Sequence, residues 1–370
     1  WRYYPLYSNE LFGDWNYIFK YYSCLNNINI IENNCSKILT YQFVYPKIWL
    51  KIIHYIYPIF SYLISVIILI YILITFNIFK NIPKIYHLLF LISPTSILLL
   101  QRGNNEILIF LLIFSFISLM KSNKFKFFSI IPFVTCSLLK IYPLSLIFIF
   151  IIHEIRKITL LKIFAVVSFF IIILFSFKEF LYIKSIFNHG KVTLVYGADS
   201  IFHIVNFIIK KPNLNYPLLS VLSLMIIIVI STCVKMKKYK NLKKENLLMF
   251  LVGSTILVSS FFLNLSFEYR FIYIILVLPF FFENKKIIGD NISNILIFLI
   301  YFVLWFEFFI LFSKYLVSFE TIKSTQGNVI NFRTSIVGGL IVIKNLIYWL
   351  INFGLIIISR NIIFKNILKI

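Results

Sequence analysis

Two polar clusters border a pair of apolar runs and carry the residues best suited to chemistry. The run at 107–120 follows Arg102-Gly103-Asn104-Asn105-Glu106, and the run at 127–140 leads to Lys140-Ile141-Tyr142-Pro143. If the two runs form a helical hairpin, Arg102, Glu106 and Lys140 lie at the same end of neighbouring helices. Charged groups in so apolar a setting are costly and tend to mark function.

The residue types in these clusters fit the binding of a phosphate. The guanidinium of Arg102 can bind a phosphate through two parallel hydrogen bonds, and the N-terminus of the following helix also favours an anion. Asn104, Glu106, Lys140 and Tyr142 are further candidate substrate- or phosphate-binding residues. Structural roles are equally open here: Asn104 or Asn105 can cap the helix, Glu106 can complement its dipole, and Lys140 can reach toward the membrane interface.

Three residues outside this hairpin could also act on a substrate. Asp14 could be a general base that takes a proton from an acceptor hydroxyl, or it could cap a helix from Trp15 to about Leu25. Arg270 could contact an anionic head group or anchor a helix at the membrane interface. His189 could bind substrate or simply be exposed. The sequence has no Cys/His spacing typical of a metal site, so no metal ligands are predicted.

The composition is that of an α-helical membrane protein. Hydrophobic residues make up 61% of the chain and charged residues 13%, and the mean hydropathy is +0.93. Apolar runs of about 18 residues or more recur along the chain. The net charge of +23 does not indicate nucleic-acid binding, because the basic residues stand mainly in short clusters between apolar runs rather than on one soluble face.

We therefore predict an all-α, polytopic membrane protein with a single integral domain over 1–370. Several predicted spans are short for a hydrocarbon core of ~30 Å, so broken or tilted helices are expected. There are about eleven spans, and about twelve with a helix that we expect to precede Trp1. The spans are predicted at about 52–79, 85–101, 105–120, 127–140, 142–154, 160–178, 216–234, 247–265, 270–282, 291–313 and 336–359.

The distribution of basic residues predicts the topology. Alternate connections are basic, above all the segment from Lys235 to Lys244 with its six lysines, and the positive-inside rule places these in the cytoplasm. The segments 1–47, 179–215 and 314–335 then form extracytoplasmic loops. Because that side is oxidising, Cys24 and Cys35 in the first loop are a candidate disulfide pair.

Taken together, these residues resemble glycosyltransferase family 87, a family of bacterial transferases of the GT-C class. The Arg-Gly-Asn at 102–104 and the Lys-Ile-Tyr-Pro at 140–143 carry the resemblance, and GPI mannosyltransferases have a similar pair. The resemblance implies a GT-C-like fold, an active site at the outer membrane face and Asp14 as the catalytic carboxylate. Many relatives have Asp-x-Asp at this point. Here Asn16 replaces the second carboxylate, so a divalent metal is not indicated.

The resemblance also implies a reaction and its partners. The enzyme would transfer a hexose, such as mannose, from a polyprenyl-phosphate sugar to a glycan or glycolipid acceptor, with inversion. No cofactor is certain, and a divalent metal is possible but not indicated. It would work in the lipid bilayer of the inner (plasma) membrane. An O-antigen polymerase and a flippase or transporter of lipid-linked sugars are the alternatives. Transport predicts polar groups near mid-membrane in both halves of the chain.

Overall fold

The chain is helical throughout the part that the computed structural model describes. Within that part every regular element is a helix and no strand occurs, which confirms the all-α prediction there. The helices gather in two compact units, Trp1–Lys80 with Ile97–Gly190 and Asn81–Ser96 with Lys191–Ile370. The single domain predicted for 1–370 stays a prediction. The described residues are 13–27, 47–56, 60–102, 104–152, 159–186, 197–198, 202, 216–233, 246–263, 268–321 and 328–363.

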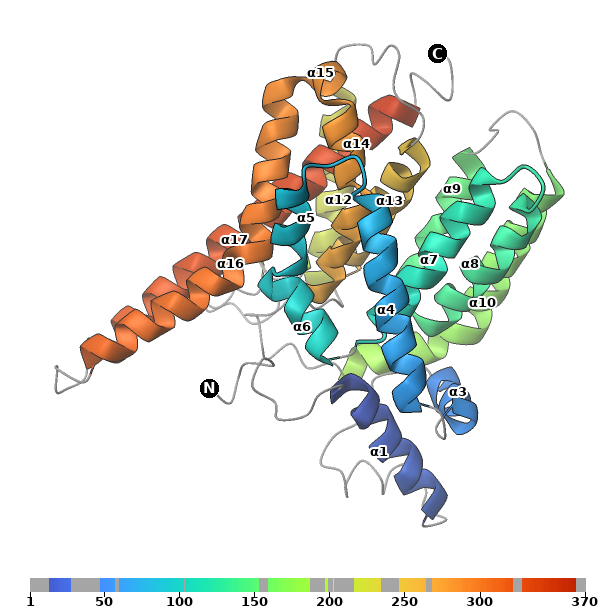
Figure 1. Cartoon of the computed structure of the whole chain (residues 1–370), viewed down its shortest axis with the longest axis horizontal. Helices are drawn as coiled ribbons and strands as arrows, with labels where there is room; N and C mark the ends of the chain where they lie inside the picture. The colour runs from blue at the N-terminus through green and yellow to red at the C-terminus, as the bar shows by residue number, and fades with distance from the viewer. Residues whose placement is uncertain are drawn as a thin grey trace. The chain divides into compact units, whose positions relative to one another are not determined.

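The first unit is organised around the antiparallel pair α7 and α8. Helix α4 packs on α7, and α10 packs on α8 and α9, so that α4, α7, α8 and α10 lie side by side (Figure 1). Phe150 of α9 contacts Phe116 of α7 and Phe133 of α8 with ring centroids 5.3 Å apart in each case, which joins three helices through one aromatic cluster. The helices of this unit are α1 (Gly13–Asn27), α3 (Ile48–Ile56), α4 (Phe60–Ile78), α7 (Glu106–Lys121), η3 (Lys126–Ser129), α8 (Ile130–Leu139), η4 (Tyr142–Leu146), α9 (Ile147–Ile152) and α10 (Leu160–Ile186).

The second unit surrounds a buried 3-10 helix, η6, whose residues from Phe271 to Leu276 are fully buried. Gly253 of α13 permits this burial, because a Cβ at that position would lie 2.8 Å from the Cβ of Leu276. The helices of this unit are α5 (Lys84–Leu91), α12 (Tyr216–Cys233), α13 (Leu247–Phe262), η6 (Glu268–Leu276), α14 (Leu278–Glu283), α15 (Lys285–Ile288), α16 (Asp290–Thr321) and α17 (Asn328–Ile362). Helix α6 (Pro94–Arg102) crosses from this unit into the first.

The span predicted at 85–101 is broken between α5 and α6. Pro94 opens α6, where its missing N–H costs nothing, and it disfavours a helical conformation for Ser93. The Ser93 hydroxyl accepts a hydrogen bond from the N–H of Ser96 at 3.3 Å, as a helix cap does. The two helices meet at a bend of 51°. This bent pair is either a broken span or a re-entrant loop.

Two other predicted spans also contain 3-10 turns. The segment predicted at 270–282 consists of η6 followed by α14, with Pro279 in the first turn of α14. The segment predicted at 142–154 begins as η4, with Pro143 in its first turn, and continues as α9. A proline has no N–H to donate and fixes its own φ, so each segment changes helix type close to its proline.

Two helices in the described residues are long and apolar enough to cross a membrane, Asp290–Phe309 and Gly339–Ile362. The bent pair α5 and α6 makes a third if it is one span. Shorter apolar helices of 10 to 17 residues include Leu218–Cys233 and Leu247–Phe262. The count of about eleven spans stays a prediction.

Helices extend into each of the segments predicted to be extracytoplasmic loops. Helix α1 lies within 1–47, α10 continues to Ile186, α16 continues to Thr321 and α17 begins at Asn328. The sequence has no proline or glycine between 314 and 321 to end α16, so its helix can continue past the apolar stretch. The remaining parts of these three segments lie almost entirely outside the described residues.

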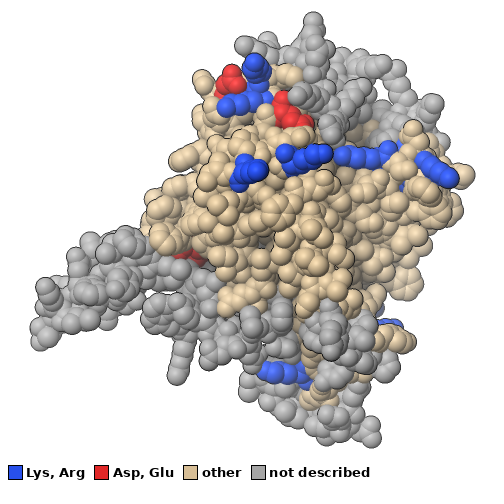
Figure 2. Space-filling model, viewed as in Figure 1, with Lys and Arg blue, Asp and Glu red and all other residues tan. Residues whose placement is uncertain are grey.

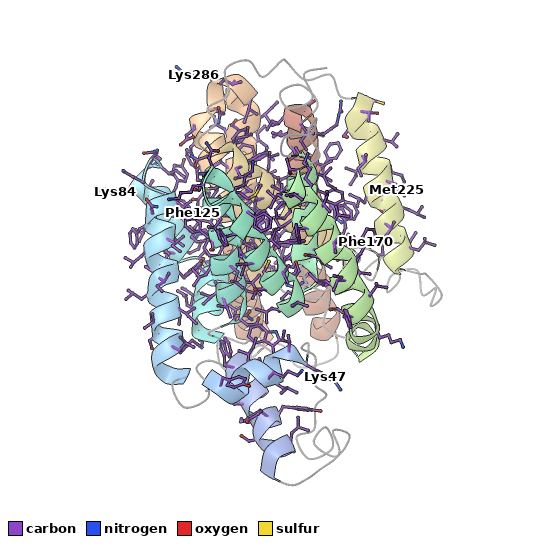
Figure 3. The ribbon with its side chains drawn as sticks, turned by 90° about the vertical axis from the view of Figure 1, so that its right-hand side faces the viewer. Lys47, Lys84, Phe125, Phe170, Met225 and Lys286 are labelled. Atoms are coloured by element: carbon purple, nitrogen blue, oxygen red, sulfur yellow. The ribbon has the colours of Figure 1, made fainter. Side chains whose placement is uncertain are left out.

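Large apolar side chains are exposed on several helices. On α10, Leu174 is 77% and Phe175 is 80% exposed, while Phe170 of α10 and Met225 of α12 are each 59% exposed and point outward (Figure 3). On the face drawn in Figure 2, acidic and basic side chains stand in small groups and leave broad areas without charge. Such extended apolar surface is typical of helices that face lipid or a partner.

Candidate functional site

A buried cluster in the first unit brings together three of the residues selected from the sequence. Glu106, in the first turn of α7, is fully buried. Its carboxylate accepts a hydrogen bond from the Tyr142 hydroxyl and lies 3.2 Å from the Lys140 ammonium. The Lys140 side chain is 12% exposed, so the ion pair is screened from water on the Glu106 side and reachable on the Lys140 side. We call Glu106, Lys140 and Tyr142 the carboxylate cluster.

The start of α7 fixes the position of Glu106. The Glu106 N–H donates to the Asn104 side-chain oxygen at 2.8 Å, and the Asn104 N–H donates to the Leu99 carbonyl at 3.1 Å. Asn104 therefore serves the helix start, as one of the two roles considered for it requires. With α7 beginning at Glu106, the carboxylate also lies where the helix dipole favours a negative charge.

The interruption between helices α8 and η4 fixes the position of Lys140. Helix α8 ends at Leu139, Lys140 has an extended backbone (φ −148°, ψ 143°), and Pro143 lies in the first turn of η4. The indole N–H of Trp49 donates to the Leu139 carbonyl at 3.2 Å, which satisfies one of the acceptors left open at the end of α8. The break thus turns the chain so that Lys140 and Tyr142 both reach Glu106.

Helix α1 is connected to the same break through two tryptophans. Trp15 of α1 packs edge-on against Trp49 of α3, with ring centroids 5.3 Å apart, and both side chains are buried. The helix predicted from Trp15 to about Leu25 runs from Gly13 to Asn27. Asp14 thus lies in its first turn, not ahead of the helix as the capping role would need. The side chain of Asp14 is outside the described part of the structure.

The other predicted site residues are not joined to this cluster by the described contacts. Arg102 is the last residue of α6, and its side chain is not described. His189 lies outside the described residues. Arg270 is 9% exposed and belongs to the second unit. The active site expected at the outer membrane face stays a prediction.

Of the four cysteines, Cys24 in α1 is disulfide-bonded, whereas Cys136 and Cys233 are free. The partner predicted for Cys24, Cys35, lies outside the described residues. No group of three or more His, Cys, Asp or Glu side chains that could hold a metal ion occurs in the described part of the chain.

Asn105 was considered from the sequence only as an alternative helix cap and not as a binding residue. It is 1% exposed, and neither its amide oxygen nor its amide nitrogen has a hydrogen-bond partner in the described structure. An unsatisfied buried amide costs about 1–3 kcal/mol, so such groups often mark a place where a ligand or water binds. The signal available in the sequence was the pair Asn104-Asn105. A helix start needs only one capping asparagine, so the second one is left without a structural role.

A second buried ion pair joins α16 and α17 in the second unit. The Lys344 ammonium donates to the Glu307 carboxylate, and the two residues are 2% and 5% exposed. The sequence predictions did not include this pair. The sequence pattern that could have predicted it is a pair of opposite charges, one in each of two successive apolar runs. Both charges lie at similar distances from the segment that connects the runs.

The comparisons with known proteins give no relative for this chain, which matches no protein-family model, no curated protein and no solved structure.

Proposed function

We propose that the chain is an integral membrane glycosyltransferase of the GT-C type. It would transfer a hexose from a polyprenyl-phosphate sugar to a glycan or glycolipid acceptor at the extracytoplasmic face of the inner membrane. The observation that supports this most is the carboxylate cluster. It joins the two polar segments on which the resemblance to glycosyltransferase family 87 rests, and it lies at a helix break packed through Trp49 against the helix that carries Asp14.

Membrane integration is supported by the long apolar helices and by the exposed apolar side chains of α10 and α12. Lipid chains would cover these side chains, because the bilayer core is as apolar as they are. The predicted topology puts the start of α7 and the end of α8 at the outer face. Polar groups at that depth meet the phosphate of a membrane-bound donor.

In this proposal Lys140 binds the phosphate of the donor. Its ammonium has three N–H donors, so it can pair with Glu106 and still offer a donor to a phosphate oxygen. Glu106 is a positioning residue, because it holds the ammonium at the edge of the buried cluster. Arg102 and Asn105 begin and end the polar segment that precedes Glu106. They would contact the same sugar donor, Arg102 through its positive charge and Asn105 through its neutral amide.

The reaction is a direct displacement at the anomeric carbon. Asp14 takes the proton of an acceptor hydroxyl as that oxygen forms a bond to the anomeric carbon. The bond from this carbon to the phosphate oxygen breaks at the same time, and polyprenyl phosphate leaves with the electron pair. Lys140 stabilises the negative charge of the leaving phosphate. A single displacement inverts the configuration of the sugar.

The second candidate function is transport of a lipid-linked sugar, and the buried pair Glu307–Lys344 is the observation that favours it. Under the predicted topology, however, Glu307 lies in the last turn of the apolar stretch 290–309 and Lys344 in the second turn of 339–362. Both residues would then lie toward the outer end of their spans rather than at mid-membrane. We therefore rank transfer above transport, and above an O-antigen polymerase.

The test is transfer by the full chain in proteoliposomes supplied with labelled polyprenyl-phosphate mannose or glucose and an acceptor glycolipid. We expect Asp14→Asn to abolish product formation without changing thermal stability. Asp290→Asn is the matched control, because Asp290 is exposed and also lies in the first turn of its helix. Product formation by Asp14→Asn at the wild-type rate would contradict the base assignment, and labelled lipid that crosses the bilayer unchanged would support transport.

A further inference from the structure

The first unit contains a cavity at the end of α7 that lies away from the carboxylate cluster. Its volume is ≈ 330 Å³, near the lower limit for a small-molecule site. The residues that line it are partly polar (Asn123, Lys126, Thr159 and Lys162) and partly apolar (Phe127, Phe150 and Leu161). Helix α7 has 16 residues and so spans about 24 Å, which separates this cavity from the carboxylate cluster by most of a bilayer core.

The positions of the two lysines are set by elements that contact each other directly. Lys126 opens η3 and Lys162 lies in the first turn of α10. The rings of Phe127 and Phe164 hold η3 against α10, with centroids 5.5 Å apart. Two cations from different elements therefore border the same cavity, and each ammonium has three donors, so each can contact an anion in addition to a protein partner.

The start of α10 strengthens the preference for an anion. The Thr159 carbonyl accepts the N–H groups of Lys162 and Ile163, at 2.9 and 3.2 Å, so the helix begins at the cavity. The first N–H groups of a helix have no partner within it and favour a negative charge. Together with the two lysines, this makes the cavity a site for an oxyanion.

The apolar lining residues of the cavity and its surroundings indicate that the anion is attached to a lipid. Phe125, Phe127 and Phe128 are 48%, 48% and 51% exposed beside the basic turn, a combination typical of the membrane interface. Phe125 lies toward the end of the first unit opposite to Lys47, which precedes α3 (Figure 3). A bound lipid could place its phosphate among the lysines and the start of its chains along Phe127, Phe150 and Leu161.

We propose that this cavity binds the phosphate of a membrane lipid at the face opposite to the carboxylate cluster. The ligand class is a phosphate ester, and its source is an anionic lipid such as phosphatidic acid rather than a soluble phosphate. The volume admits a head group and not a complete sugar-lipid, so the site is distinct from the proposed donor site. The inference does not depend on the transfer reaction.

The experiment measures binding to the purified full chain in a neutral detergent. The probes are phosphatidic acid, phosphatidylcholine, glycerol 3-phosphate and inorganic phosphate, each titrated while bound adducts are counted by native mass spectrometry. We expect one phosphatidic acid bound tightly, and little binding of the other three probes. Binding of glycerol 3-phosphate or inorganic phosphate as tightly as phosphatidic acid would overturn the lipid assignment.

Variants then test the place of binding. The double variant Lys126→Gln/Lys162→Gln should bind phosphatidic acid about 30-fold more weakly, equivalent to about 2 kcal/mol for two interfacial lysines. The matched control is Lys121→Gln/Lys124→Gln, which makes the same charge change in exposed residues that do not line the cavity. We expect less than a twofold change there. Equal losses in the two double variants would overturn the site.

A third variant tests whether the space in the cavity, and not only its positive charge, is needed for binding. Asn123 lines the cavity, so Asn123→Trp should fill part of it without altering the charge, and we expect it to weaken phosphatidic acid binding at least tenfold. Asn123 is exposed, so the tryptophan need not disturb the packed helices. Wild-type binding by Asn123→Trp would show that surface charge alone attracts the lipid and would overturn the proposal.

Discussion

The pairing of Lys140 with Glu106 makes a quantitative prediction. Glu106 is fully buried and Lys140 nearly so, and breaking a buried pair by removing one partner costs about 3–5 kcal/mol. Because the Lys140 side chain is 12% exposed, water can partly solvate its charge once the carboxylate is removed. We therefore expect Glu106→Gln to lower the free energy of unfolding by about 3 kcal/mol. Glutamine keeps an acceptor oxygen for the Tyr142 hydroxyl, so the change isolates the ion pair.

The reverse change should be more costly. Lys140→Met leaves the fully buried Glu106 carboxylate without its cation in the cluster, where the neutral Tyr142 hydroxyl still donates to it. We expect this change to lower the free energy of unfolding by about 4–5 kcal/mol. In the double variant Glu106→Gln/Lys140→Met no uncompensated charge remains. Its stability should return to within about 2 kcal/mol of the wild type, which makes the two changes strongly non-additive.

The assay has two readouts on the same detergent-purified chain. Tryptophan fluorescence on heating reports stability. A loss of about 3 kcal/mol in the free energy of unfolding lowers the melting temperature by about 6–12 °C for a domain of about 150–250 residues. Transfer from labelled polyprenyl-phosphate sugar reports function. We expect the double variant to regain thermal stability but not activity, because methionine cannot bind the leaving phosphate.

The cycle Glu307→Gln/Lys344→Met in the second unit is the matched control. It makes the same chemical changes in a pair that is at least as buried, so we expect the same non-additivity in stability. Its double variant should retain transfer. Strictly additive stability changes for Glu106 and Lys140 would refute the ion pair, and full activity of their double variant would refute the phosphate role of Lys140.

Three further predictions concern single residues. Asn105→Ala should raise the donor KM about fivefold while stability stays unchanged or rises by about 1 kcal/mol, since it removes an unsatisfied buried amide; lower stability with unchanged KM would indicate a structural role. Trp49→Phe should cost about 1 kcal/mol in thermal unfolding because the bond to the Leu139 carbonyl is lost, and no loss would mean that water replaces it. Gly253→Ala should destabilise by about 1–3 kcal/mol, whereas Gly339→Ala, with open space around its Cβ, should be neutral or stabilising; equal effects would contradict the close packing of α13 on η6.

Much of the helical pattern was predictable from the sequence. The runs predicted at 105–120, 216–234 and 247–265 correspond closely to α7, α12 and α13. These runs are long, uninterrupted and apolar, so local composition alone determines a helix. The predictions were less accurate at 142–154 and 270–282, where a proline and tight packing introduce 3-10 turns within a run that is apolar throughout.

The candidate site was predictable in its members but not in their partners. The sequence identified Glu106, Lys140 and Tyr142 as polar residues at the ends of apolar runs. It left open whether Glu106 binds substrate or only complements the dipole of its helix, and whether Lys140 binds a phosphate or is simply interfacial. These alternatives differ only in distances across the fold, which local pattern does not contain.

The sequence by itself determined that this chain is helical and strongly apolar, because residue type and periodicity act locally along the backbone. Only the tertiary structure decided that Lys140 meets Glu106 across 33 intervening positions, that the Asn104 side chain accepts the Glu106 N–H while Asn105 is left without a described partner, and that Glu307 meets Lys344. The physical reason is that a buried polar group must find its partner within about 3 Å, and only packing brings distant segments that close.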